Sequence, residues 1–457
     1  MRIVIVGAGE VGFTLAETLS SEGHDVNVVE QDDVRADRAE SELDVRVIRG
    51  NGSRPQVLYD AGVRRGCDVD FLVACTDRDE ANILACWIGR HAGVRRVIAR
   101  AKDLEFTDSP TWGRDLGIDM MVSPERSVAR EILELLSVST AIHTAELLGG
   151  RAAIYAFRIA PESPLVGLSL KQMRMKNTDL IAIVVYIERE GEDDIVPNGD
   201  TVLQEGDICY VVSYREQVWR LEKLFQLRSS RPLKRVFIVG GGKLGFQVAQ
   251  RLQSNYRGVE VRLIDRDREQ CEKLASELGG TLVLHGDGAD AGLLTEEGIA
   301  EADGYVCATE SDEVNLVYGT IAKSLGAQKC IAVVRKRLYL DMPERMPIDS
   351  VVDPNAALAS VILRYIRYPG NSRALSIIEK IDAEMLEIEI PQNYPMEGIT
   401  LSELGVPRGV LVALVARKKE VFVPGGDTAF KAGDHVILFA STEQMPAASE
   451  FFRTDRE

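Results

Sequence analysis

Short hydrophobic runs alternate with segments of helical character in the first part of the chain, and the same alternation starts again near residue 236. The runs at residues 3–6 and 236–239 each lead directly into a glycine-rich turn, a helical segment and a second hydrophobic run. Strands that alternate with helices in this way are typical of a parallel, doubly wound sheet. The pattern therefore predicts two Rossmann-like α/β domains of the same kind.

The later turns and strands of the two halves match in the same order. The third predicted strands end at residues 50–52 and 286–288, the fourth run over 70–76 and 303–309, the fifth end in Arg100 and Arg335, and the sixth run over 118–122 and 348–352. Pro124 and Pro354 are expected to stop the sixth strands. The chain is thus predicted to carry an internal duplication.

The remainder of each half is shorter and rich in predicted strands. Turns containing Asp200, Asp207, Asp427 and Asp434 lie beside alternating segments. An aspartate in a turn usually hydrogen-bonds its own backbone, although these carboxylates could also bind a cation. The polar stretch 228–232 has the composition of a linker. We predict four domains, at 1–140, 141–228, 234–368 and 369–457, in which a small β-rich α+β domain follows each doubly wound sheet.

The two glycine-rich turns have the spacing G-x-G-x-x-G, at Gly7, Gly9 and Gly12 and at Gly240, Gly242 and Gly245. The second predicted strands end in Glu30 and Asp265, 23 and 25 residues after the first glycine. A strand before the loop, a helix after it and an acidic residue downstream are the context of the dinucleotide-binding fingerprint. The alternative is a pair of tight turns that bind nothing.

Each part of this fingerprint has a physical reason. The first glycine allows the tight turn, the second lets a pyrophosphate approach the backbone, and the third lets helix and strand pack closely. The helix start offers free N–H groups and a positive dipole end to phosphates. Glu30 and Asp265 can accept hydrogen bonds from ribose hydroxyls, and their charge disfavours NADP.

Composition narrows the functional classes. The 457 residues carry a net charge of −17, so a large basic surface for nucleic acid or an anionic membrane is not expected. The seven cysteines form no C-x-x-C pair, which fits a reducing cytoplasm. No apolar stretch approaches the roughly 20 residues needed to cross a bilayer, and no signal peptide is expected.

Catalytic chemistry is not indicated. The five histidines do not match between the halves, and no Ser-His-Asp set, metal-spaced Cys/His cluster or Walker lysine is present. We therefore expect no enzymatic activity and no metal site, with the nucleotide acting as an effector. Two alternatives remain open at this point, an NAD-dependent oxidoreductase and a nucleotide sensor that works without a channel.

The loops, the two acidic residues, the turn at Gly50 and Gly52, and the motif Thr-Asp-x-Asp-Glu-x-Asn at residues 76–82 together resemble tandem RCK (KTN) domains. The resemblance implies a cytoplasmic gating-ring subunit of a bacterial Trk-type potassium uptake system, peripheral on the inner face of the cell membrane. It also implies assembly into a ring, expected to be a homotetramer. A TrkH/TrkG-like potassium-translocating membrane subunit would be the partner, and NAD(H) or ATP/ADP the regulatory ligands.

The resemblance implies nucleotide contacts in both halves. In the first half they are Gly7, Ala8, Gly9, Glu10, Val11, Gly12, Glu30, Thr76, Asp77 and Arg100. By position, the second half offers Gly240, Gly241, Gly242, Lys243, Leu244, Gly245, Asp265, Thr309, Glu310 and Arg335. The threonines end predicted strands, where open α/β sheets bind ligands.

Two pairs of side chains leave alternatives open. Arg100 and Arg335 could meet phosphate or ribose oxygens, or instead pair with Asp79 or Asp312. Glu10 and Lys243 put opposite charges at equivalent helix entrances. The difference predicts NAD(H) at the first site and ATP/ADP or NAD(H) at the second, unless both side chains only face solvent.

Overall fold

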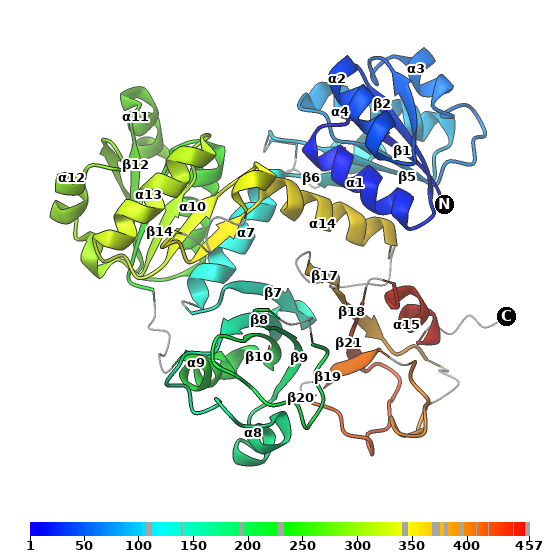
Figure 1. The fold of residues 1–457 in the computed structure, drawn as a ribbon. Coiled ribbons are helices and arrows are strands. Elements are labelled where there is room, and N and C mark those ends of the chain that lie inside the picture. The colour runs from blue at the N-terminus through cyan, green and yellow to red at the C-terminus, as the bar shows by residue number, and fades with distance from the viewer. Residues whose placement is uncertain are drawn as a thin grey trace.

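Two six-stranded parallel sheets dominate the two halves of the chain (Figure 1). The structure is a computed structural model that describes residues 1–103, 105–106, 112–138, 140–191, 195–226, 233–340, 346–367, 375–378, 383–392, 397–407, 409–418, 420–441 and 443–452. The strand orders are β3-β2-β1-β4-β5-β6 and β13-β12-β11-β14-β15-β16. The two orders are equivalent, so the duplicated doubly wound fold is confirmed.

The elements of the two sheets follow the predicted order. The first half contains β1 (Arg2–Val6), α1 (Glu10–Ser21), β2 (Asp25–Glu30), α2 (Asp33–Glu42), β3 (Arg46–Arg49), α3 (Pro55–Asp60), β4 (Phe71–Ala74), α4 (Asp79–Ala92), β5 (Arg96–Arg100), α6 (Trp112–Asp115) and β6 (Met120–Val122). The second contains β11 (Arg235–Val239), α10 (Lys243–Asn255), β12 (Glu260–Asp265), α11 (Arg268–Glu277), β13 (Thr281–His285), α12 (Ala291–Glu296), β14 (Gly304–Cys307), α13 (Asp312–Ser324), β15 (Cys330–Val333) and β16 (Ser350–Val352). The central strands are continuous buried apolar runs because helices cover both faces.

The helices that follow the two sheets are exchanged between the halves (Figure 1). Helix α7 (Pro124–Ser137) packs Ile132 and Leu135 into the core of the second sheet, around Val236 and Val306. Helix α14 (Pro354–Arg367) packs in the same way onto the first sheet. Both prolines therefore open helices, where a missing N–H costs nothing. The alternation of strands and helices did not predict this exchange.

The exchange has a measurable consequence at Leu136 on α7. Gly304 on β14 makes room for this side chain, because a Cβ at Gly304 would lie 2.3 Å from Leu136 Cδ2. We expect Leu136→Ala to lower the free energy of unfolding by about 2–5 kcal/mol, as other large-to-small substitutions in protein cores do. Although residue 136 belongs to the first half of the sequence, hydrogen exchange should quicken in β14 and β15.

Leu282→Ala is the matched control, because Leu282 on β13 is 48% exposed. It should change exchange little. Faster exchange confined to residues 124–158 in the Leu136→Ala protein would contradict the exchanged packing.

The sheets of the two small domains are antiparallel. The first contains β7 (His143–Leu147), β8 (Ala152–Arg158), α8 (Leu170–Lys176), β9 (Ala182–Glu188), β10 (Ile208–Tyr214) and α9 (Val218–Gln226). The second contains β17 (Leu375–Ile378), β18 (Ala383–Glu389), β19 (Leu411–Arg417), β20 (Glu420–Phe422), β21 (His435–Ser441) and α15 (Met445–Phe451). Their sheets share one core, in which Tyr186 and Val212 pack with Leu414 and Phe439. The predicted α+β domains after each sheet are therefore confirmed in class.

Two of the four turn aspartates, Asp207 and Asp434, have structural partners. Asp207 is 1% exposed, and it accepts hydrogen bonds from Arg189 Nε at 2.8 Å and from the backbone N–H of Gln204. Asp434 is bonded in the same way by Arg417 and Lys431. These contacts favour the structural reading of the turns. The predicted linker 228–232 lies outside the described residues, and the exact domain boundaries stay a prediction.

Candidate nucleotide-binding sites

The two glycine loops lie where β1 and β11 end and α1 and α10 begin. Gly7 and Gly240 both have φ +103°, a conformation that favours glycine. A Cβ at Gly12 would lie 1.8 Å from the carbonyl oxygen of Gly7, and one at Gly245 would lie 1.9 Å from that of Gly240. The first and third glycines of each loop are thus required by the fold itself.

The second glycine of each loop is not required by the fold. A Cβ at Gly9 would have only Arg35 Nη1 within 4 Å, at 3.8 Å, and one at Gly242 would meet nothing. Both residues have ordinary backbone angles and cap their helices without a side-chain hydrogen bond. These positions leave open space in front of the first helix N–H groups, which have no hydrogen-bond partner among the described residues. That is the environment a phosphate needs.

Glu30 and Asp265 fasten the loops to the neighbouring strands. Glu30 is buried and accepts hydrogen bonds from the N–H of Ala8 at 2.6 Å and of Gln31 at 2.7 Å. Asp265 accepts from the N–H of Gly241 at 2.5 Å and of Asp267 at 2.8 Å. Because each carboxylate oxygen has two lone pairs, both groups keep the capacity to accept from a ribose hydroxyl.

A buried asparagine fixes each of the two threonines. Asn82 Oδ1 accepts from the N–H of Thr76 at 2.9 Å and from its hydroxyl at 2.7 Å, while Asn82 Nδ2 donates to the carbonyl of Arg100 at 2.9 Å. Asn315 does the same for Thr309 and for the carbonyl of Val333. Each asparagine therefore ties the end of one strand to the next.

These asparagines were missed as candidate site residues. In the sequence Asn82 is part of the motif that resembles RCK domains, but no role follows from that. The spacing Thr-x-x-x-x-x-Asn, which is the same in both halves, is the signal that could have identified both asparagines. Both side chains are fully buried, so they position Thr76 and Thr309 rather than face the open loop.

The register of the fifth strands corrects one expectation. β5 ends at Arg100, but β15 ends at Val333, two residues before Arg335. The N–H of Ala101 donates to Val122 as that of Val334 donates to Val352, which makes Val333 the counterpart of Arg100. The prediction that the second-half strand ends in Arg335 is wrong, because a motif match without register cannot resolve a shift of two residues.

The two arginines consequently have different surroundings. Arg100 Nη1 donates to the carbonyl of Cys75 at 3.5 Å, and its buried Nε has no hydrogen-bond partner among the described residues. Arg335 Nη1 donates to the carbonyl of Thr309 at 3.2 Å and lies 3.3 Å from Asp312 Oδ1. The alternative of an ion pair is therefore realised in the second half.

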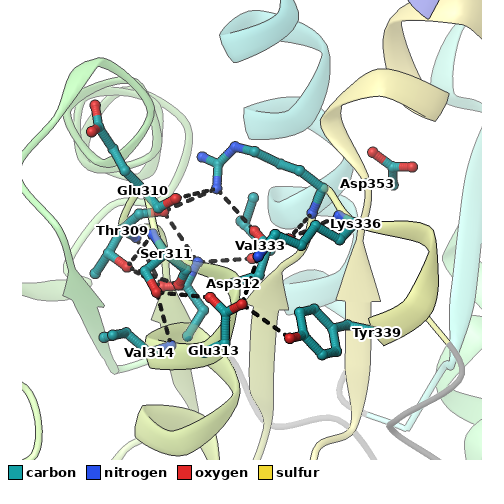
Figure 2. A network of polar contacts seen from close by, with 12 residues as sticks. Thr309, Glu310, Ser311, Asp312, Glu313, Val314, Val333, Lys336, Tyr339 and Asp353 are labelled. Atoms are coloured by element: carbon teal, nitrogen blue, oxygen red, sulfur yellow. Dashed lines mark hydrogen bonds and ion pairs between the residues drawn. The ribbon is translucent and has the colours of Figure 1, made fainter. Parts of the chain in front are cut away.

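A further set of contacts holds the segment after β15 in place (Figure 2). Glu313 accepts hydrogen bonds from Lys336 Nζ at 2.6 Å and from the hydroxyl of Tyr339 at 3.0 Å. The Lys336 ammonium, helped by hydrogen bonds from the backbone and from Tyr339, lowers the pKa of Glu313 to about 2. Asp312 also accepts hydrogen bonds from the backbone N–H of Arg335 at 2.9 Å and of Lys336 at 2.8 Å, so the backbone at Arg335 is held beside α13.

The charged residues at the helix entrances are exposed, but each has a partner. Glu10 Oε1 lies 3.4 Å from Arg38 Nη1, which offsets part of its charge. Lys243 Nζ donates to the carbonyl of Lys102 at 3.4 Å and so reaches the first Rossmann domain. Asp77 and Glu310 are also exposed, just beyond the fixed threonines. Glu10 and Lys243 therefore both contact other residues, and the alternative in which both side chains only face solvent does not fit the structure.

Comparison with known proteins identifies the family. The model of the TrkA-N domain matches residues 3–124 and 236–354, and that of the TrkA-C domain matches 154–226 and 385–453. The chain belongs to the TrkA family. The Trk system potassium uptake protein TrkA of Azorhizobium caulinodans is 34% identical over the whole of both chains, and that of Haemophilus influenzae is 31% identical over 99% of each.

Solved structures support the tandem fold of this TrkA-family chain. A structure described as the GsuK channel bound to NAD superposes with a TM-score of 0.61 at 20% identity, covering 99% of this chain and 78% of that one. The crystal structure of the GsuK RCK domain gives a TM-score of 0.60 at 20% identity, with coverage of 99% and 94%. At this identity the likeness shows the RCK fold alone.

Proposed function

We propose that this chain is the nucleotide-binding regulatory subunit of a Trk-type potassium uptake system. In this role it controls potassium movement through a TrkH/TrkG-like membrane subunit. The observation that carries the proposal is the open second glycine of each loop, which the fold does not require and a bound pyrophosphate would. Membership of the TrkA family supplies the transport context.

The proposal includes a membrane partner. Among the described residues no helix is long and apolar enough to span a bilayer. In the proposed role the potassium pathway belongs to the TrkH/TrkG-like membrane subunit. Four copies of this chain, assembled as a homotetrameric ring, would present eight Rossmann-like domains to the inner face of that partner. A nucleotide that binds one ring shape about 100-fold better than another shifts the equilibrium by roughly 2.7 kcal/mol.

Calorimetry on the full chain with NADH and with ATP tests the binding. The full chain is needed because the exchange of α7 and α14 would leave an isolated half without its covering helix. We expect two binding events that are removed separately by changes in the two loops. The absence of binding heat with either nucleotide would contradict the proposal.

The two sites should differ in ligand preference. The Glu10 carboxylate opposes additional negative charge and the Lys243 ammonium favours it, each by about 0.3–1 kcal/mol at a helix entrance. We therefore propose NAD(H) at the first site and ATP/ADP, or NAD(H) with lower preference, at the second. The preferences should separate by a few-fold to about 30-fold, on the order of 1–2 kcal/mol.

Lys243→Glu should remove most of this difference. The measurement is the ratio of ATP to NADH affinity in full-length protein in which the other site has been silenced, at low and high salt. Lys273→Glu on the exposed face of α11 is the matched control, because it makes the same charge change away from the loop. Equal ratios at both sites, insensitive to salt and to Lys243→Glu, would end the idea.

A further inference from the structure

An arginine of α2 lies at the edge of the first glycine loop. Arg35 Nη1 lies 3.8 Å from the position that a Cβ would take at Gly9, and apart from the chain neighbours of Gly9 no other described residue comes within 4 Å of that position. The Arg35 guanidinium therefore borders the open space in which a phosphate would approach the loop. Arg35 belongs neither to the G-x-G-x-x-G loop nor to the acidic end of β2, so the fingerprint gives it no role.

Hydrogen bonds fix the backbone of Arg35 relative to the loop. Glu30 Oε2 accepts from the N–H of Ala8 in the loop at 2.6 Å, and Glu30 Oε1 accepts from the N–H of Asp32 at 2.9 Å. Asp32 in turn caps α2, since its Oδ1 accepts from the N–H of Arg35 at 3.0 Å. One carboxylate thus joins the glycine loop to the cap of α2, and the Arg35 side chain starts from a fixed point beside the loop.

The guanidinium of Arg35 is exposed and has no hydrogen bond or ion pair among the residues that the structure describes. The four carboxylates of α2 pair instead with Arg49 or Arg38; they are Asp33, Asp37, Glu40 and Glu42. Three and four residues after Arg35, where a helical ion-pair partner would lie, the chain has Arg38 and Ala39. The N–H donors of the Arg35 guanidinium are therefore available to a ligand at the loop.

The equivalent position in the second half has a different chemistry. Gln270 follows Asp265 by five residues, as Arg35 follows Glu30, and both helices are capped by an aspartate at their start. Gln270 Nε2 donates to the carbonyl of Gly241 at 2.6 Å, so this side chain is neutral and already bonded to its own loop. Of the two equivalent positions, only the first therefore offers a cation beside the open glycine.

We propose that Arg35 binds the pyrophosphate of the nucleotide at the first site, and that the second site lacks this contact. The inference rests on the proposed function and adds a phosphate-binding residue to its first site. A guanidinium presents parallel N–H donors that match two oxygens of a phosphate. A pyrophosphate at Gly9 would thus accept from the N–H groups at the start of α1 on one side and from Arg35 on the other.

This contact acts on the part of the ligand that NAD(H) and ADP have in common. Arg35 should therefore raise the affinity of the first site for both nucleotides. The preference between them stays with the charges at the two helix entrances, Glu10 and Lys243, which lie on the other side of the second glycine in each loop.

Calorimetry with NADH tests the contact in full-length protein that carries Gly242→Asp, so that only the first site is intact. Arg35→Gln, which gives the first half the side chain type of the second, should weaken NADH binding about tenfold. Inorganic pyrophosphate, added as a competitor of NADH, should lose affinity by the same factor. Arg35→Lys keeps the charge but not the paired donors, and should lose less affinity than Arg35→Gln.

Arg65→Gln is the matched control, because Arg65 is exposed and precedes β4, at the opposite edge of the same sheet from the loop. It should leave NADH affinity unchanged.

The inference and the proposed function fail in different ways. NADH affinity in Arg35→Gln within twofold of the unchanged first site, or unchanged competition by pyrophosphate, would overturn the contact and leave nucleotide binding standing. An equal loss at the second site, measured in protein that carries Gly9→Asp, would show an indirect effect and would also overturn it. A first site that gives no binding heat before Arg35 is changed would instead contradict the proposed function, and the inference would fall with it.

Discussion

Replacing Gly9 or Gly242 with aspartate should abolish nucleotide binding in its own half and leave the fold intact. Neither position has an atom closer than 3.8 Å to the added Cβ, so the change is tolerated sterically. A carboxylate about 4 Å from a phosphate costs roughly 4 kcal/mol at an effective dielectric constant near 20. We therefore expect affinity to fall by about a thousandfold, measured by calorimetry on the full-length protein.

Gly279→Asp is the matched control for these changes. It is the same substitution in the second Rossmann domain, at a glycine with open space around it and away from the loop. It should leave both affinities unchanged, and all three variants should melt within a few degrees of the wild type. Unchanged nucleotide affinity in a well-folded Gly9→Asp or Gly242→Asp protein would remove that loop from the site.

Deletion of the gene should impair potassium uptake and leave soluble redox activities unchanged. The reason is the combination of TrkA-family membership with two candidate nucleotide sites that lack a catalytic set. The measurement is growth and initial uptake rate at limiting potassium in a strain without redundant uptake systems. We expect the wild-type gene to restore uptake.

A gene carrying both loop changes, Gly9→Asp and Gly242→Asp, separates regulation from mere presence of the subunit. It should produce normal amounts of protein but fail to restore nucleotide-dependent uptake. Normal uptake in the deletion strain at limiting potassium would contradict the transport assignment, and a lost dehydrogenase activity would favour the oxidoreductase instead.

The parts of the fold that depend on neighbouring residues could be predicted from the sequence. The positive φ of Gly7 and Gly240 and the close approach of Gly12 and Gly245 follow from one loop and one helix start. The positions of Glu30 and Asp265 follow from the length of the intervening helix. The parallel, doubly wound sheet of each half was therefore predicted correctly, and the nucleotide contacts of the two loops stay a prediction.

The exchange of α7 and α14 could not be predicted in this way. An apolar helix face shows that the helix is buried, but it does not identify which of two similar sheets covers it. The decisive contacts, such as Leu136 over Gly304, join residues far apart in the chain. The same limit explains the shift at Arg335, since strand register depends on the paired strand and not on the motif alone.

Nucleotide control of transport is measured most directly as potassium flux into vesicles that contain the TrkH/TrkG-like membrane subunit and this chain. We expect NADH and ATP to change the flux in different directions or to different extents. The protein carrying both Gly9→Asp and Gly242→Asp should lose these responses but still bind the membrane subunit. A flux that does not respond to either nucleotide, or a response that survives in the doubly changed protein, would contradict nucleotide control by these two loops.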